Sequence, residues 1–227
     1  MTGIATLVRR AATSALDAAL PAMCVGCGTE GEALCDTCRP ALDARLDEPA
    51  GVPIGLPAAI PSPLLQLDWC APFAGVVRDA LHAIKYGGEQ RVAEPLGAAV
   101  ARRWARIGVG ADLVTHVPVH ADRARQRGYD QAALIARSAA THLTLPHARL
   151  LVRERATIAQ FDLDRRRRAT NVRGAFALDG RAPPVAGRWI LLIDDVTTTG
   201  ATLSACAVPL IEAGALGVSA ITVARER

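Results

Sequence analysis

Residues 189–202 read WILLIDDVTTTGAT, and this stretch decides the fold. Its four consecutive apolar residues, Ile190 to Ile193, are typical of a strand that is buried on both faces of a parallel sheet. Asp194 and Asp195 follow at once, then a loop rich in threonine, and then a helical pattern from about Ala201. In open parallel sheets ligands bind beyond the carboxyl ends of the strands, so this loop is the expected binding site.

The loop has the composition of a site for a phosphorylated sugar. Gly200 permits a positive φ and a close approach of the backbone, while loop amides and a helix N-terminus attract a phosphate. Asp194 and Asp195 precede the loop, where their carboxylates can accept bonds from ribose hydroxyls and stabilise positive charge at C1′. The alternative is a strand that ends in a solvated turn with a capping threonine; that alternative leaves the paired acids unexplained.

Strand-like and helix-like segments alternate around this stretch, from about Leu64 to the end of the chain. The predicted strands are 69–75, 112–119, 149–155, 171–178, 188–195 and 217–225, and the predicted helices are 76–85, 91–107, 131–143 and 201–215. This alternation predicts an α/β fold with a mostly parallel sheet flanked by helices. Pro95 and Pro209 are expected near an end of their helices or at a kink.

Composition divides the chain into three predicted parts. Residues 1–48 contain a helix-like start and four of the six cysteines, residues 49–63 contain five prolines and read as an extended linker, and residues 64–227 form the main domain. Asp17 interrupts the apolar residues near the N-terminus, and no apolar run is long enough to span a bilayer. We therefore expect a soluble, cytoplasmic protein without membrane insertion.

The cysteines predict a metal site. Cys24, Cys27, Cys35 and Cys38 form a C-x₂-C-x₇-C-x₂-C pattern. Two such CxxC knuckles complete a closed tetrahedral Cys₄ site, so the predicted metal is a structural Zn²⁺. A disulfide pair is the alternative, which a cytoplasmic location disfavours.

Two further segments carry positive charge that suits a pyrophosphate. Lys85 is the only lysine in a chain whose lysines and arginines number 26, and it lies where a predicted helix gives way to Tyr86 and two glycines. Arginines recur at alternate positions up to Arg127, and an arginine fork is a natural pyrophosphate binder. A lysine left by chance is the alternative for Lys85. His116 and His120 read as structural or loop residues.

The chain has one concentrated positive run, which consists of Arg165, Arg166, Arg167 and Arg168. Two interpretations stay open: a patch that tracks the phosphates of single-stranded nucleic acid, or a solvated flap whose arginines meet acidic neighbours. Phe161 is the one adjacent aromatic residue, whereas single-strand sites interleave several.

Taken together, these motifs resemble the ComF family of type I phosphoribosyltransferase-like proteins, over nearly the whole chain. The resemblance rests on the paired CxxC knuckles, IKYGG (84–88), PVHADRARQRGYDQ (118–131), RATNVRGAF (168–176) and IDDVTTTGAT (193–202). It implies a phosphoribosyltransferase fold that binds phosphoribosyl pyrophosphate (PRPP) with Mg²⁺ and carries a zinc-finger-like N-terminus. Some similar proteins are implicated in the uptake of single-stranded DNA during natural transformation.

By position, the resemblance assigns the residues of the site. Asp194 and Asp195 become the acids that meet the ribose and the metal, and Lys85, Tyr86 and Arg127 become the pyrophosphate side. The 5′-phosphate loop becomes Thr197, Thr198, Thr199, Gly200, Ala201 and Thr202. The catalytic candidates are Asp194, Asp195, Lys85 and Arg127.

The sequence departs from the family pattern at two places. Asp130 stands where members usually carry Asn, and QFDLD (160–164) replaces a more usual Gln–x–Gly–Leu. These departures put in doubt what the loop around Gln160 recognises.

Two functional hypotheses follow. In the first, the protein is a phosphoribosyltransferase whose acceptor the sequence does not name. In the second, it is a non-catalytic accessory of DNA uptake that binds single-stranded nucleic acid and keeps a vestigial or regulatory PRPP site. The implied partners are PRPP, single-stranded DNA and DNA-uptake proteins; the oligomeric state stays open, with a homodimer as one candidate.

Overall fold

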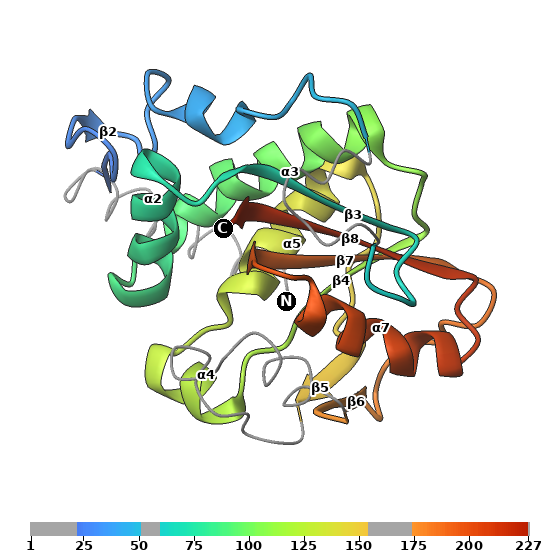
Figure 1. The fold of residues 1–227 in the computed structure, drawn as a ribbon. Coiled ribbons are helices and arrows are strands. Elements are labelled where there is room, and N and C mark those ends of the chain that lie inside the picture. Colours follow the sequence, from blue (N-terminus) through green and yellow to red (C-terminus); the bar gives the residue numbers. More distant parts are fainter. Residues whose placement is uncertain (1–21, 51–59, 154–173, 227) are drawn as a thin grey trace, which may run out of the picture.

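The computed structural model describes residues 22–50, 60–153 and 174–226, which Figure 1 draws as a coloured ribbon. The helix predicted near the N-terminus and most of the proline-rich segment lie outside these residues. The arginine run also lies outside them, so its two interpretations both stay predictions for Arg165, Arg166, Arg167 and Arg168.

Four parallel strands form the central sheet. In order across the sheet they are β3 (Gln66–Pro72), β8 (Gly217–Arg225), β7 (Trp189–Thr197) and β4 (Leu113–His116). Strand β7 therefore lies inside the sheet, where Ile193 is level with His116 of β4 and with Ile221 of β8. Because β4 ends at this level, Asp194 and Asp195 project beyond it at the carboxyl edge of the sheet.

Helices cover both faces of the sheet (Figure 1). The long helices are α2 (Gly75–Tyr86), α3 (Ala93–Ile107), α5 (Gln131–Leu143) and α7 (Ala201–Glu212). Leu191 and Ile193 share a core with α2, α3 and α5, whereas Ile190 and Leu192 share a second core with α7. This alternation explains the unbroken apolar run of β7, because successive side chains of a strand face opposite layers. The predicted α/β fold with a parallel sheet flanked by helices is confirmed.

Three smaller features differ from the predictions or refine them. The segments predicted as strands at 149–155 and 171–178 contribute β5 (Leu151–Arg153) and β6 (Phe176–Leu178), which pair antiparallel in a separate ribbon. Between β4 and α5 the chain forms a short helix that was not predicted, α4 (Ala121–Arg127). Pro95 lies in the first turn of α3 and Pro209 in the last turn of α7, so both are near helix ends as expected.

The described N-terminal residues pack against the same core as α2 and α3. They contain the hairpin strands β1 (Ala22–Met23) and β2 (Glu30–Gly31) and the 3₁₀ helix η1 (Arg39–Asp43), while a second 3₁₀ helix, η2 (Gln90–Val92), precedes α3. Leu34 and Leu42 are buried in this core. No helix among the described residues is long and apolar enough to cross a membrane.

A buried ion pair ties the N-terminal segment to the sheet. Arg103 of α3 and Asp68 of β3 are each 1% exposed, and their side chains meet at 2.9 Å. Arg103 also donates to the backbone carbonyls of Arg45, Leu46 and Glu48. A single guanidinium thus satisfies a buried carboxylate and the carbonyls that end the N-terminal segment, which a buried charge requires.

We expect Arg103→Leu to lower the free energy of unfolding by about 3–5 kcal/mol, because the buried charge of Asp68 would keep only the longer contact to the Arg45 cation and the hydrogen bond from Trp69 N. Denaturant unfolding followed by circular dichroism measures this loss. Arg102→Leu is the matched control, since Arg102 pairs with Asp43 at a partly exposed position and its loss should cost less than about 1 kcal/mol. Equal losses in the two variants would contradict the assignment.

Candidate functional site

A cleft of about 880 Å³ opens at the carboxyl edge of the sheet, bordered by α2, α4 and the start of α7. The residues predicted for the sugar phosphate and the pyrophosphate all line this one cleft: Lys85, Tyr86, Arg127, Asp194, Asp195, Thr197, Thr198, Thr199, Gly200, Ala201 and Thr202. They come from three segments that are far apart in the sequence, so the fold gathers them.

The conformation of the loop between β7 and α7 is restricted at Gly200 and anchored by Arg225. Gly200 has φ 79° and precedes the first residue of α7. A Cβ at this position would lie 2.7 Å from Leu67 Cδ2, so the residue is restricted by both its backbone angle and its surroundings. Arg225 Nε donates to the backbone oxygen of Thr198 at 3.4 Å and anchors the loop from β8. The first amides of α7 have no helical acceptor and border the cleft, which is the arrangement that binds anions.

Asp195 is the centre of a hydrogen-bonded network. Its carboxylate is buried, and Oδ2 lies 3.1 Å from Lys85 Nζ and 2.9 Å from Gln131 Nε2, which donates to it. Arg127 Nη1 in turn donates to Gln131 Oε1 at 2.8 Å. Sequence reasoning assigned no role to Gln131, because an uncharged side chain at a helix start carries no chemical signal of its own.

The charges of the network shift the ionisation of its members. Burial raises the pKa of Asp194 well above its usual value, and the neighbouring charge of Asp195 raises it further. For Lys85, burial works to lower the pKa, but the carboxylate of Asp195 outweighs it and the net shift is upward. Lys85 therefore stays protonated at neutral pH, while the two adjacent carboxylates favour the approach of a further cation.

Arg127 also contacts the α2 side of the cleft. Its Cζ atom lies 5.3 Å from the ring centroid of Tyr86, which is 70% exposed. The Tyr129 hydroxyl donates to the backbone oxygen of Ile84 and ties the end of α4 to α2. The guanidinium is thus held at the border of the cleft by a cation–π contact and by Gln131.

Arginines other than Arg127 also line the cleft, and one of them, Arg123, belongs to the alternating series that the sequence assigned to the pyrophosphate. They are Arg78, Arg123 and Arg153. Arg153 comes from β5 and lies with its Cζ atom 5.5 Å from the Phe176 ring centroid. Burial, and then the charge of Arg123, lower its pKa. The sequence did not place Arg153 in the cleft, because β5 reaches the cleft through its pairing with β6, which is not local in the sequence.

Asp130 and the stacked pair His116 and His147 take structural positions, whereas His120 caps α4 and lines the cleft. Asp130 accepts from Val119 N through Oδ2 and from Ala133 N through Oδ1, each at 3.1 Å, and so caps α5. His116 stacks on His147, and burial lowers the pKa of each to about 4. Both rings are therefore neutral at physiological pH, in line with the structural interpretation of His116. An Asn at position 130 has one carbonyl oxygen, whereas Asp serves both amides with separate oxygens.

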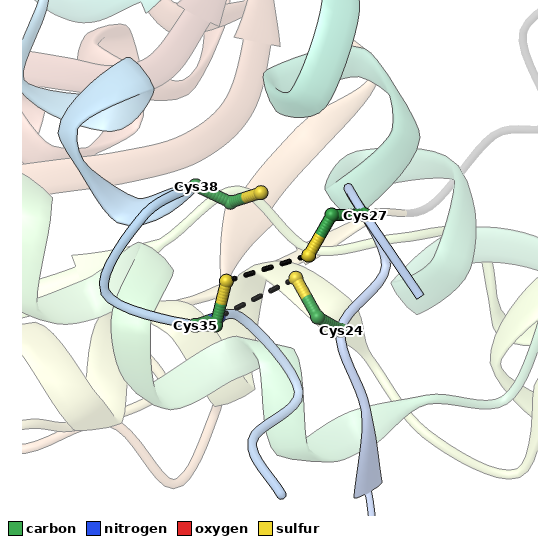
Figure 2. A group of neighbouring side chains, drawn as sticks. All are labelled: Cys24, Cys27, Cys35 and Cys38. Atoms are coloured by element: carbon green, nitrogen blue, oxygen red, sulfur yellow. Dashed lines mark hydrogen bonds between the residues drawn. The ribbon is translucent and has the colours of Figure 1, made fainter. Parts of the chain in front are cut away.

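The four N-terminal cysteines form a second candidate site. Figure 2 shows their side chains converging on one space, and their sulfur atoms all lie within 4.8 Å of one another. Zn–S bonds of about 2.3 Å in a tetrahedron separate the sulfur atoms by roughly 3.8 Å, so the donor set fits Zn²⁺. Gly26 allows this approach, since a Cβ there would lie 2.8 Å from Cys38 Sγ.

The ionisation of the thiols also suits a cation. Burial acts to raise the pKa of Cys24, but backbone N–H groups from Cys35, Cys27 and Gly26 outweigh it and lower the pKa to about 6. Burial and the neighbouring cysteines raise the pKa of Cys38 to about 12. Four thiolates this close together are stable only with a cation among them, and Zn²⁺ is a cation that fits this donor set.

We expect about one Zn²⁺ per chain, and a loss of most of it in Cys35→Ser, because a closed site needs all four thiolates. Elemental analysis of protein purified in metal-free buffers measures the metal. Cys206→Ala is the control: this buried thiol lies outside the cluster and its removal should leave the zinc content unchanged. Wild-type protein with well under half an equivalent would contradict the assignment.

Comparisons with known proteins agree with the motifs. The chain is 30% identical to the DNA utilization protein YhgH of Escherichia coli O6:H1 over 206 residues, covering 82% of this chain and 87% of that protein. It is 29% identical to YhgH of Escherichia coli K12 with the same coverage, and 33% identical to competence protein F of Haemophilus influenzae over 94 residues, or 41% of each chain. No family model matches the sequence.

Two solved structures overlap part of the chain. One is a glutamine PRPP amidotransferase from B. subtilis, complexed with ADP and GMP, with a TM-score of 0.39, 25% identity and coverage of 58% of this chain and 26% of that chain. The other is described as the allosteric regulatory enzyme of purine biosynthesis, with a TM-score of 0.41, 20% identity and coverage of 63% and 30%.

Proposed function

Because the chain belongs to the YhgH/ComF family, we propose that it binds PRPP with Mg²⁺ in the cleft beyond β7 and transfers the phosphoribosyl group to an acceptor in the course of DNA utilization. The observation that carries this proposal is the meeting of three segments around Asp195. The acids lie in the last part of β7, Lys85 lies in the last turn of α2, and Arg127 reaches Asp195 through Gln131.

The phosphate loop and the acids support the sugar half of this ligand. The first residues of α7 and the loop threonines line a single cleft, where their amides and hydroxyls can hold a 5′-phosphate. Asp194 and Asp195 lie one step before the loop, where the pentose ring attached to that phosphate would lie. Their carboxylates can accept bonds from the ribose hydroxyls and stabilise positive charge at C1′ as the leaving group departs.

Lys85 and Arg127 support the pyrophosphate half. Both are cations that line the cleft, and Arg127 has a planar fork of donors. Mg²⁺ would be held by oxygens of Asp194, Asp195 and the pyrophosphate, and would neutralise the leaving group. In this assignment Lys85 gives up part of its contact with Asp195 when the ligand enters, and Arg127 turns toward the pyrophosphate.

The cysteine module has a structural part in the proposal. We divide the chain into a zinc module at 1–48, a linker at 49–63 and the phosphoribosyltransferase-like domain at 64–227. A row of stacked groups links module and cleft: Arg45 Cζ lies 4.1 Å from the ring centroid of Trp69, and Arg225 Cζ lies 4.8 Å from the same centroid. A zinc–thiolate site suits the reducing cytoplasm, where we place the protein.

We expect calorimetric titration to detect binding of Mg²⁺–PRPP by the wild-type protein and a loss of at least about hundredfold in affinity in Asp194→Asn/Asp195→Asn, because the ribose hydroxyls and the metal lose charged acceptors. Asp47→Asn is the control, since this exposed carboxylate pairs with Arg106 away from the cleft. A well-folded wild type that binds no PRPP would overturn the proposal and direct the search to other ligands.

A second candidate function is the binding of single-stranded nucleic acid, which the names of the YhgH and competence protein F relatives favour. In this case the arginine run 165–168 would track the phosphates, together with arginines that line the cleft. The two functions are compatible, because the run and the sugar phosphate loop use different residues.

We expect replacement of Arg165, Arg166, Arg167 and Arg168 by Ser to weaken the binding of a single-stranded oligonucleotide. The salt dependence of the affinity should also fall, by about 0.7 in slope for each phosphate that the protein no longer neutralises. Fluorescence anisotropy at several salt concentrations measures both effects. Arg106→Ser/Arg181→Ser is the control, since these arginines do not line the cleft. An unchanged slope would favour the solvated flap.

A further inference from the structure

Gln131 joins the two halves of the cleft. Its side chain belongs to a residue that is 5% exposed, and it makes one hydrogen bond to each half: Nε2 donates to Asp195 Oδ2 at 2.9 Å, and Oε1 accepts from Arg127 Nη1 at 2.8 Å. We propose that Gln131 is a positioning residue that transmits the state of Arg127, on the pyrophosphate side, to the carboxylate of Asp195, on the ribose side. This inference rests on the proposed function and deepens it.

The chemistry of its two neighbours fixes the orientation of the Gln131 amide. A guanidinium has only donors, and a carboxylate only accepts. The reversed amide would place its NH₂ group against Arg127 and its oxygen against Asp195, so both bonds would be lost together. The amide is therefore locked while both partners are in place, and a change at either partner removes the reason for the orientation at the other.

The backbone of Gln131 is fixed independently of its side chain. Gln131 is the first residue of α5, and Asp130 before it accepts from Val119 N and from Ala133 N. The capped helix start gives Gln131 a rigid base. Motion that begins at Arg127 is therefore passed on through the side chain of Gln131 and not absorbed by the helix.

Arg127 is placed to respond to a ligand. It is partly exposed at the border of the cleft, where its guanidinium lies over the Tyr86 ring. At the other end, Asp195 Oδ2 is shared between Gln131 and Lys85. When Arg127 turns toward a pyrophosphate, its hydrogen bond to Gln131 Oε1 changes. The hydrogen bond from Gln131 to the Asp195 carboxylate, which meets the ribose, then changes as well. Occupation of one half thus alters the affinity of the other.

Ribose 5-phosphate isolates this effect, because it carries the phosphate and the sugar hydroxyls but no pyrophosphate. Its affinity is measured by calorimetry in the wild type, Gln131→Met, Arg127→Met and the double variant, with Gln90→Met as a control at a glutamine outside the cleft. Thermal unfolding of each variant checks its fold. A parallel titration of Mg²⁺–PRPP into the wild type tests the proposed function by itself.

We expect Gln131→Met to lower the affinity for ribose 5-phosphate by about tenfold or more, because Asp195 loses a charge-assisted hydrogen bond that orients it. Arg127→Met should also lower it, although this ligand does not reach Arg127. The double variant should bind no more weakly than Gln131→Met alone, since both changes break the same link. Gln90→Met should bind as the wild type does.

Two results would overturn the inference while leaving the proposed function intact. One is wild-type binding of PRPP with an affinity for ribose 5-phosphate that Arg127→Met leaves unchanged. The other is a pair of losses that add in the double variant, which would mean that Arg127 acts through its charge alone and Gln131 through local packing. A folded wild type that binds neither ligand would overturn both. Should Gln131→Met not fold, the Arg127→Met result decides. A lower affinity for ribose 5-phosphate in that variant requires a link between Arg127 and the ribose side, because the ligand does not reach Arg127.

Discussion

Burial of β7 on both faces is the constraint from which the site follows. A strand covered by α2, α3 and α5 on one side and by α7 on the other can expose polar groups only where it extends beyond a neighbouring strand. Asp194 and Asp195 stand at that point, directly beyond the level at which β4 ends. The same covering that makes the strand apolar brings the end of α2 and the starts of α5 and α7 around these two acids, so fold and site have one origin.

The desolvation of these acids sets the rest of the arrangement. Two carboxylates at the end of a buried strand raise the free energy of the folded protein unless cations and hydrogen-bond donors lie near them. Lys85 and Gln131 provide this for Asp195, while Asp194 keeps a raised pKa. In the free protein, the charge of Asp195 is therefore compensated by Lys85, whereas Asp194 has no cation of its own among the described residues. That imbalance is a physical reason to expect a cation to enter with the ligand, and it needs no additional protein residue.

Much of the site could be predicted from local patterns in the sequence. The run Ile190–Ile193 followed by two acids and a Thr–Gly loop is contiguous, and so the strand, the loop and the helix after it could be predicted. Lys85 stood out as the only lysine in the chain. Gln131 and Arg153 could not be assigned in this way, because each reaches the cleft by a non-local route: Gln131 through the cap of α5, and Arg153 through the antiparallel pairing of two three-residue strands.

The cysteine module and the cleft are connected by more than covalent linkage. Arg45 of the N-terminal segment lies near the ring of Trp69, which Arg225 also approaches, and Arg225 donates to the backbone oxygen of Thr198 in the loop between β7 and α7. Arg45 is itself held by Asp68 and by its backbone bond to Arg103. If Zn²⁺ binds the cysteines as proposed, its loss would loosen the residues that lead to Arg45, and the loop between β7 and α7 would be the first part of the cleft affected. A structural metal can thus matter for ligand affinity without approaching the ligand.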